Sequence, residues 1–90
     1  MTDPQTTTPV TAEQMQAWME DYIRSVIDIP EGDFPSEDRF DLIGLDSVEV
    51  TIMAGMIEER FALQVEPSEI LENPNVKALS KHLVTRLNAG

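Results

Sequence analysis

Residues 44–61 read GLDSVEVTIMAGMIEERF. Asp46 is a favourable helix N-cap, and Glu49 follows three residues later, where the acid of a capping box belongs. The stretch therefore predicts a helix that begins at Asp46 or Ser47 and runs to about Phe61. At about 100° of rotation per residue, apolar residues collect on one side of this helix and predict a face that packs on a core. That face consists of Val50, Met53, Ala54, Ile57 and Phe61.

A second apolar row lies on the opposite side of the same helix, centred roughly 150° from the first. The row consists of Val48, Ile52 and Met56. Surface helices ordinarily present charged side chains there, so either another element covers the row or a partner protein docks on it. In the docking interpretation, Gly55 permits close approach, and Glu49, Glu58 and Glu59 provide a polar rim.

The rest of the chain predicts three further helices. The first begins with a capping box at Thr11–Gln14 and continues with apolar residues at three- and four-residue spacing, until Pro30 prevents its extension. Its apolar residues are Met15, Trp18, Met19, Tyr22, Ile23, Val26 and Ile27. A short helical segment is predicted at residues 67–71. For the last helix, Asn73 is the predicted N-cap and Pro74 the first position, and Val76, Leu79, Leu83 and Leu87 form its stripe.

Residues 28–43 predict a long loop between the first two helices, and Phe34, Phe40, Leu42 and Ile43 are expected to pin it to the core. No run of residues alternates with period two, so no sheet is predicted. The expected fold is all-α: a small four-helix bundle with this long loop and a short third helix. Residues 11–88 form the predicted domain, and residues 1–10, rich in threonine and proline, form a flexible tail.

Composition excludes several classes of function. The 90 residues contain no cysteine, which removes thiolate metal sites and any cysteine nucleophile. A net charge of -11 disfavours nucleic acid and anionic membranes as partners, and no stretch has the roughly 18 apolar residues of a membrane span. With no signal-peptide pattern, a cytoplasmic location is expected. All 17 acidic residues lie at or before Glu72, forming either a solvated surface or a face that steers basic partners.

The segment Gly44-Leu45-Asp46-Ser47-Val48-Glu49, which follows a long loop and opens a helix, resembles the attachment site of acyl carrier proteins. The resemblance extends over roughly residues 12 to 87 and includes Phe40 before the glycine and Asn73–Val76 at the start of the last helix. The Gly-Leu-Asp-Ser form is similar to that of carriers in polyketide and mixed assembly lines. Family members often have an acid five positions after the serine, whereas this chain has Ile52, which suggests a partner with a more apolar docking surface.

The resemblance implies that a phosphopantetheinyl transferase moves 4'-phosphopantetheine from coenzyme A onto Ser47, and that Asp46 helps the transferase to recognise this serine. It further implies that the arm holds acyl intermediates as thioesters and presents them to acyl-loading and acyl-transferring or condensing enzymes. These partners are expected to dock on the second helix, while the carrier itself remains a monomer. The implied docking residues are Val48, Glu49, Ile52, Gly55, Met56 and Glu59.

Catalysis by the chain itself is not expected. The single histidine, His82, lies far from Ser47 in the sequence and is predicted to be a surface residue of the last helix, so no Ser-His-Asp set is suggested. The thiol that carries the cargo therefore comes from the arm rather than from the protein.

Other functions are compatible with the same sequence. An aminoacyl or peptidyl carrier would share the serine and the fold. An unmodified acidic adaptor would use the row of Val48, Ile52 and Met56 to bind a basic protein. A calcium-binding protein is a third alternative, but its candidate ligands lack the spacing and central glycine of an EF-hand loop. Those ligands are Asp28, Glu31, Asp33, Glu37, Asp38 and Asp41.

Overall fold

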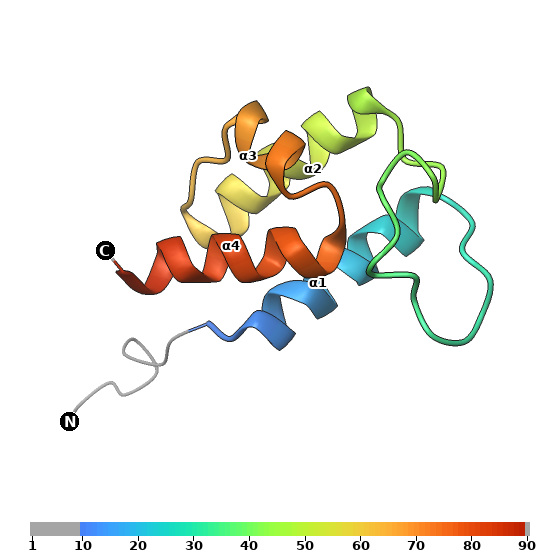
Figure 1. Cartoon of the computed structure of the whole chain (residues 1–90), viewed down its shortest axis with the longest axis horizontal. Coiled ribbons are helices and arrows are strands. Elements are labelled where there is room, and N and C mark those ends of the chain that lie inside the picture. Colours follow the sequence, from blue (N-terminus) through green and yellow to red (C-terminus); the bar gives the residue numbers. More distant parts are fainter. Residues whose placement is uncertain (1–9, 90) are drawn as a thin grey trace.

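The computed structural model describes residues 10–89 and contains four α-helices, with no strand in that range (Figure 1). The helices are α1 (Ala12–Val26), α2 (Ser47–Phe61), α3 (Pro67–Glu72) and α4 (Val76–Ala89). The all-α prediction is therefore confirmed, including the long loop before α2 and the short third helix. The predicted flexible tail lies, except for Val10, outside the described residues.

Local capping determines where α1 and α2 begin. At α1 the predicted capping box is complete: the Gln14 N–H donates to Thr11 Oγ1 at 3.1 Å, and the Thr11 N–H donates to Gln14 Oε1 at 2.9 Å. At α2 the Glu49 N–H donates to Asp46 Oδ1 at 2.9 Å. The return bond from the Glu49 side chain is not among the bonds within residues 10–89, so Asp46 caps α2 alone.

The predicted start of the last helix is wrong by two residues. Asn73 ends α3 instead, because its backbone N–H donates to the carbonyls of Glu69 and Ile70 and its side-chain amide donates to Glu69 O. Asn75 caps α4, since its Oδ1 accepts the Ala78 N–H at 2.7 Å. Pro74 lies between the two helices, and its carbonyl accepts the Phe40 N–H.

Helices α1 and α4 lie side by side and form the main layer of the core, and α2 adds its buried face to them (Figure 1). The fully buried hydrophobic side chains of the helices are Met15, Met19, Ile23, Met53, Ile57, Val76, Leu79 and Leu83. At the edge of this core Trp18 stacks on Tyr22 and meets the edge of Phe61, with ring centroids 5.7 and 5.6 Å apart. Trp18 is thus a packing residue, as its place in the apolar stripe predicts.

Two apolar residues that were expected to pack inside are exposed. Val26 ends α1 at the surface, where the chain turns into the loop. Leu42 is 73% exposed because residues 39–44 form a tight turn, in which Phe40 and Ile43 point inward and Leu42 is left on the outer side. The other predicted loop anchors hold: Phe40 is buried, and Phe34 and Ile43 pack against the core.

Both apolar faces of α2 exist in the folded chain. Met53 and Ile57 are fully buried in the core. On the opposite side Val48, Ile52 and Met56 are 64%, 49% and 40% exposed, so neither the long loop nor α3 covers them. The interpretation in which another element of the chain covers this row is therefore wrong for the described residues.

Replacing Ile57 and Ile52 separately by alanine tests the two faces of α2. Ile57→Ala removes buried atoms and leaves a cavity, so we expect the free energy of unfolding to fall by about 2–5 kcal/mol. Ile52→Ala removes the same atoms from an exposed position and is expected to change that free energy by less than about 0.5 kcal/mol. Urea denaturation followed by circular dichroism measures both, and equal losses would contradict the assignment of the faces.

Candidate functional site

A tight turn delivers the chain to the start of α2. Gly44 has a φ of 101°, in the left-handed region that favours glycine. The next residue, Leu45, is buried, and its N–H donates to Phe40 O at 2.9 Å. Because Phe40 is itself buried, this turn is anchored in the core on both sides and holds the following residues at a defined place on the surface.

Ser47 is the first residue of α2 and is exposed. Its backbone carbonyl accepts the Thr51 hydroxyl at 2.8 Å, whereas its own hydroxyl forms no hydrogen bond to another residue within 10–89. The first N–H groups of a helix lack intrahelical partners and favour an anion. Asp46 Oδ1 accepts the Glu49 N–H, so the backbone N–H groups of Ser47 and Val48 are left without an intrahelical partner near the Ser47 hydroxyl. An exposed hydroxyl with this setting fits a covalently attached phosphodiester.

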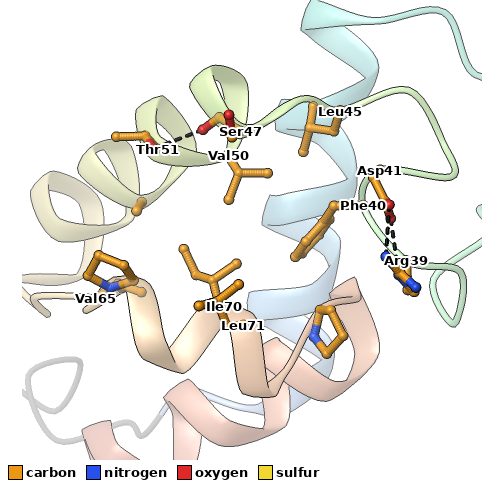
Figure 2. Close-up of a pocket in the computed structure, with 13 residues that line it drawn as sticks. Arg39, Phe40, Asp41, Leu45, Ser47, Val50, Thr51, Val65, Ile70 and Leu71 are labelled. Carbon is orange, nitrogen blue, oxygen red and sulfur yellow. Dashed lines mark hydrogen bonds and ion pairs between the residues drawn. The ribbon is translucent and has the colours of Figure 1, made fainter.

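An apolar groove of about 660 Å³ opens beside Ser47 (Figure 2). Val50 from α2 and Ile70 from α3 point toward each other across it, and Phe40 closes one end. Its lining comes from the end of the long loop, α2, the α2–α3 connection, α3 and the α3–α4 connection. The lining residues are Arg39, Phe40, Asp41, Leu45, Ser47, Val50, Thr51, Ala54, Val65, Pro67, Ile70, Leu71 and Pro74. The sequence did not reveal this groove, because no single segment contains its pattern.

Polar groups are confined to the edge of the groove. Arg39 and Asp41 form an ion pair at the loop end, with Arg39 Nε and Nη2 donating to the two carboxylate oxygens at 3.1 and 2.9 Å. Ser47 and Thr51 stand on the α2 side. The remaining walls are aliphatic, aromatic or proline side chains, so the groove suits an apolar chain better than a polar one.

The other predicted site residues lie along the outer side of α2. Gly55 and Glu59 are exposed near the apolar row, and a methyl group built at Gly55 would meet nothing within 4 Å. Glu49 differs, because it is half-buried. Burial raises the pKa of Tyr22 in α1, and the negative charge of Glu49 raises this pKa further. The Glu49 carboxylate therefore lies near α1 as well as near the outer side of α2. Glu58 and Glu59 are left as the exposed acids of the rim.

Sequence reasoning missed a charged cluster that joins α3 to α4. Glu69 accepts hydrogen bonds from His82 Nε2 and from Arg86 Nη1, each at 2.7 Å to Oε1. His82 is therefore not the simple surface residue that was expected, but a half-buried partner of Glu69. His82 and Arg86 of α4 follow Glu69 by 13 and 17 positions, so only the packing of α3 on α4 brings them to Glu69.

Neither a metal centre nor a membrane span is found in the part of the chain that the structure describes. Within residues 10–89 no three His, Cys, Asp or Glu side chains gather as metal ligands. No helix in that range is long and apolar enough to cross a membrane.

Comparison with known proteins matches the sequence and the fold of this chain to one family. The family model described as the phosphopantetheine attachment site matches residues 17–83, which include Ser47 and the groove. Acyl carrier protein TtuC from Teredinibacter turnerae is 30% identical over 87 residues, covering 96% of this chain and 100% of that protein. The solution structure of acyl carrier protein LipD from Actinoplanes friuliensis shares the fold, with a TM-score of 0.69, 24% identity and 89% of each chain covered.

These matches cover most of the chain, including the exposed serine at the start of α2. Carriers of this kind interact with a phosphopantetheinyl transferase and with biosynthetic enzymes. The chain belongs to the acyl carrier protein family: it is a carrier rather than an enzyme, and it holds acyl groups on a covalently attached 4'-phosphopantetheine arm.

Proposed function

We propose that Ser47 carries the arm. The observation that supports this most directly is its position: it is an exposed first residue of α2, placed by a turn whose neighbours Phe40 and Leu45 are buried. The Ser47 hydroxyl supplies the attachment oxygen, and the free N–H groups of the helix N-terminus stabilise the negative charge of the phosphodiester. Asp46 caps the helix and so keeps Ser47 at its end. When bound, the arm supplies the thiol that forms the thioester.

The groove beside Ser47 is the proposed shelter for the acyl chain. Ser47 stands on its edge, so a flexible arm attached there can fold back over it. Each methylene group buried against the apolar lining contributes about 0.8 kcal/mol, so a chain of several carbons gains more from the groove than an acetyl group does. The groove therefore favours an aliphatic acyl cargo, in keeping with an acyl rather than an aminoacyl or peptidyl carrier.

The row of Val48, Ile52 and Met56 is the proposed docking face for the enzymes that load, transfer or condense the acyl group. The row is exposed and lies on the same helix as Ser47, so an enzyme bound there is close to the arm. Exposed Glu58 and Glu59 at its edge favour a partner whose apolar contact surface has a basic border. Use in a polyketide or mixed assembly line, a cytoplasmic location and a monomeric state stay predictions.

Replacing Ser47 by alanine tests the attachment site. We expect wild-type protein incubated with coenzyme A and a broad-specificity phosphopantetheinyl transferase to gain the mass of one phosphopantetheine group. Ser47→Ala is expected to gain none, because it lacks the only oxygen to which the arm is attached. Ser68→Ala is the matched control, since Ser68 is also an exposed serine in the first turn of a helix, and it is expected to gain the full mass. Intact-protein mass spectrometry measures all three.

A wild-type chain that gains no mass would favour the unmodified adaptor, and a mass gain in Ser47→Ala would place the arm on another residue.

Replacing Ile52 by glutamate tests the docking face. The substitution puts a charge in the middle of the apolar row, so we expect acyl transfer with an enzyme of its native pathway to slow by roughly tenfold, a cost of about 1.4 kcal/mol. Thr85→Glu adds the same charge at an exposed position of α4 and is expected to transfer at the wild-type rate. Modification of Ser47 should be largely unchanged in both variants. Wild-type transfer kinetics for Ile52→Glu would refute the docking face but leave the carrier function standing.

A further inference from the structure

The carboxylate of Glu69 accepts the side-chain hydrogen bonds that join α3 to α4. Glu69 Oε1 accepts from His82 Nε2 and Arg86 Nη1 of α4, both at 2.7 Å. Glu69 Oε2 accepts from Arg86 Nη1 at 2.9 Å and from the Glu66 N–H at 2.7 Å. Arg86 Nη1 also donates to the carbonyl of Gln64 at 2.9 Å, in the connection that precedes α3. This Glu69–His82–Arg86 cluster therefore holds both α3 and the segment leading into it on α4.

Apolar packing holds α3 only weakly. The helix has six residues and none of them is buried. Ile70 is its one hydrophobic residue that packs against the core, and Leu71 is 79% exposed. Isolated helices of this length are unstable in water, and segments with few buried contacts open more readily than the core. The position of α3 thus depends strongly on the cluster.

The carboxylate at the centre of the cluster is charged and largely shielded from water. The Glu69 side chain is 14% exposed. Burial alone raises the pKa of Glu69, but hydrogen bonds from the Glu66 N–H and His82, together with the charge and hydrogen bonds of Arg86, outweigh it and hold the pKa below its ordinary value. Glu69 is therefore ionised at neutral pH, and its bonds to Arg86 belong to the stronger, charge-assisted kind.

The same helix forms one wall of the groove beside Ser47. Pro67, Ile70 and Leu71 line the groove from α3, and Val50 and Ala54 line it from α2. Figure 2 shows Ile70 facing Val50 across the groove. Glu69 itself is not among the lining residues, because its side chain is bonded to α4. A change in how Glu69 is held would move this wall without altering any residue that lines the groove.

We propose that Glu69 is a positioning residue for the acyl cargo: through His82 and Arg86 it fixes α3 as the wall of the groove and so determines how firmly the groove holds an acyl chain carried on Ser47. This inference rests on the proposed attachment at Ser47 and on the proposed role of the groove.

Glu69→Gln tests the proposal, because it keeps the shape of the side chain and removes the charge. The matched control is Glu72→Gln, on the same helix, where the exposed acid forms no side-chain hydrogen bond within residues 10–89. Both variants and the wild type are loaded on Ser47 with acetyl- or octanoyl-phosphopantetheine, and intact mass follows thioester hydrolysis. Acetyl- and octanoyl-coenzyme A provide the intrinsic rates of the two thioesters.

The expected result depends on chain length. In the wild type and in Glu72→Gln, octanoyl hydrolysis should be several-fold slower than its coenzyme A reference, whereas acetyl hydrolysis should follow its reference. In Glu69→Gln the protection of octanoyl should be lost, while acetyl hydrolysis is unchanged. Hydrogen exchange of the unloaded proteins should show faster exchange of α3 amides in Glu69→Gln, with α1 and α4 unaffected.

Full octanoyl protection in Glu69→Gln would overturn the proposal. Absence of protection in the wild type would overturn it together with the role of the groove, and absence of loading would reject Ser47 as the attachment site instead. Should Glu69→Gln unfold, Arg86→Gln and Arg86→Lys replace it, since both keep the Glu69 carboxylate and its bond to the Glu66 N–H. We then expect Arg86→Gln to lose protection and Arg86→Lys to retain most of it, and equal protection in the two would overturn the proposal.

Discussion

Burial of Phe40 and Leu45 anchors the long loop at the point where it enters α2. The Leu45 N–H donates to Phe40 O, and the Phe40 N–H donates to the carbonyl of Pro74, between α3 and α4. The buried side chains and backbone hydrogen bonds of Phe40 and Leu45 therefore connect the loop, the start of α2 and the connection between the last two helices. Ser47 owes its fixed place to this anchor, and Phe40 also closes one end of the groove.

Helix α2 has three apolar faces with different surroundings. One side packs on the core through Met53 and Ile57, a second is the exposed row containing Ile52, and a third lines the groove through Val50 and Ala54. A helix with only one buried face would be polar elsewhere. The apolar character of α2 on several sides is thus explained by its position between the core, the groove and the proposed docking partner.

The uneven charge distribution along the chain has a structural counterpart. Residues after Glu72 include three lysine and arginine residues but no acids, and two of these three bind acids from earlier segments. Lys77 Nζ donates to Glu37 of the long loop at 2.9 Å, and Arg86 donates to Glu69 of α3. The exposed Lys77–Glu37 pair contributes little free energy, whereas Glu69 is largely shielded from water and has several donors. Helix α4 therefore forms ion pairs with both the long loop and α3, and only the pair with α3 is expected to contribute substantially to stability.

The sequence by itself determined the features that depend on neighbours along the chain. Capping by Thr11 and Asp46, the bounds of α2 and its two apolar faces follow from hydrogen bonds and periodicity within a few residues, and the Asp-Ser motif at Ser47 is likewise local. Only the tertiary structure decided that Asn75 rather than Asn73 caps α4, that the outer row of α2 stays uncovered, and that a groove opens beside Ser47. It also decided the pairing of His82 with Glu69. These features depend on distances between segments that are far apart in the chain, and those distances are set by how the helices pack rather than by any local pattern.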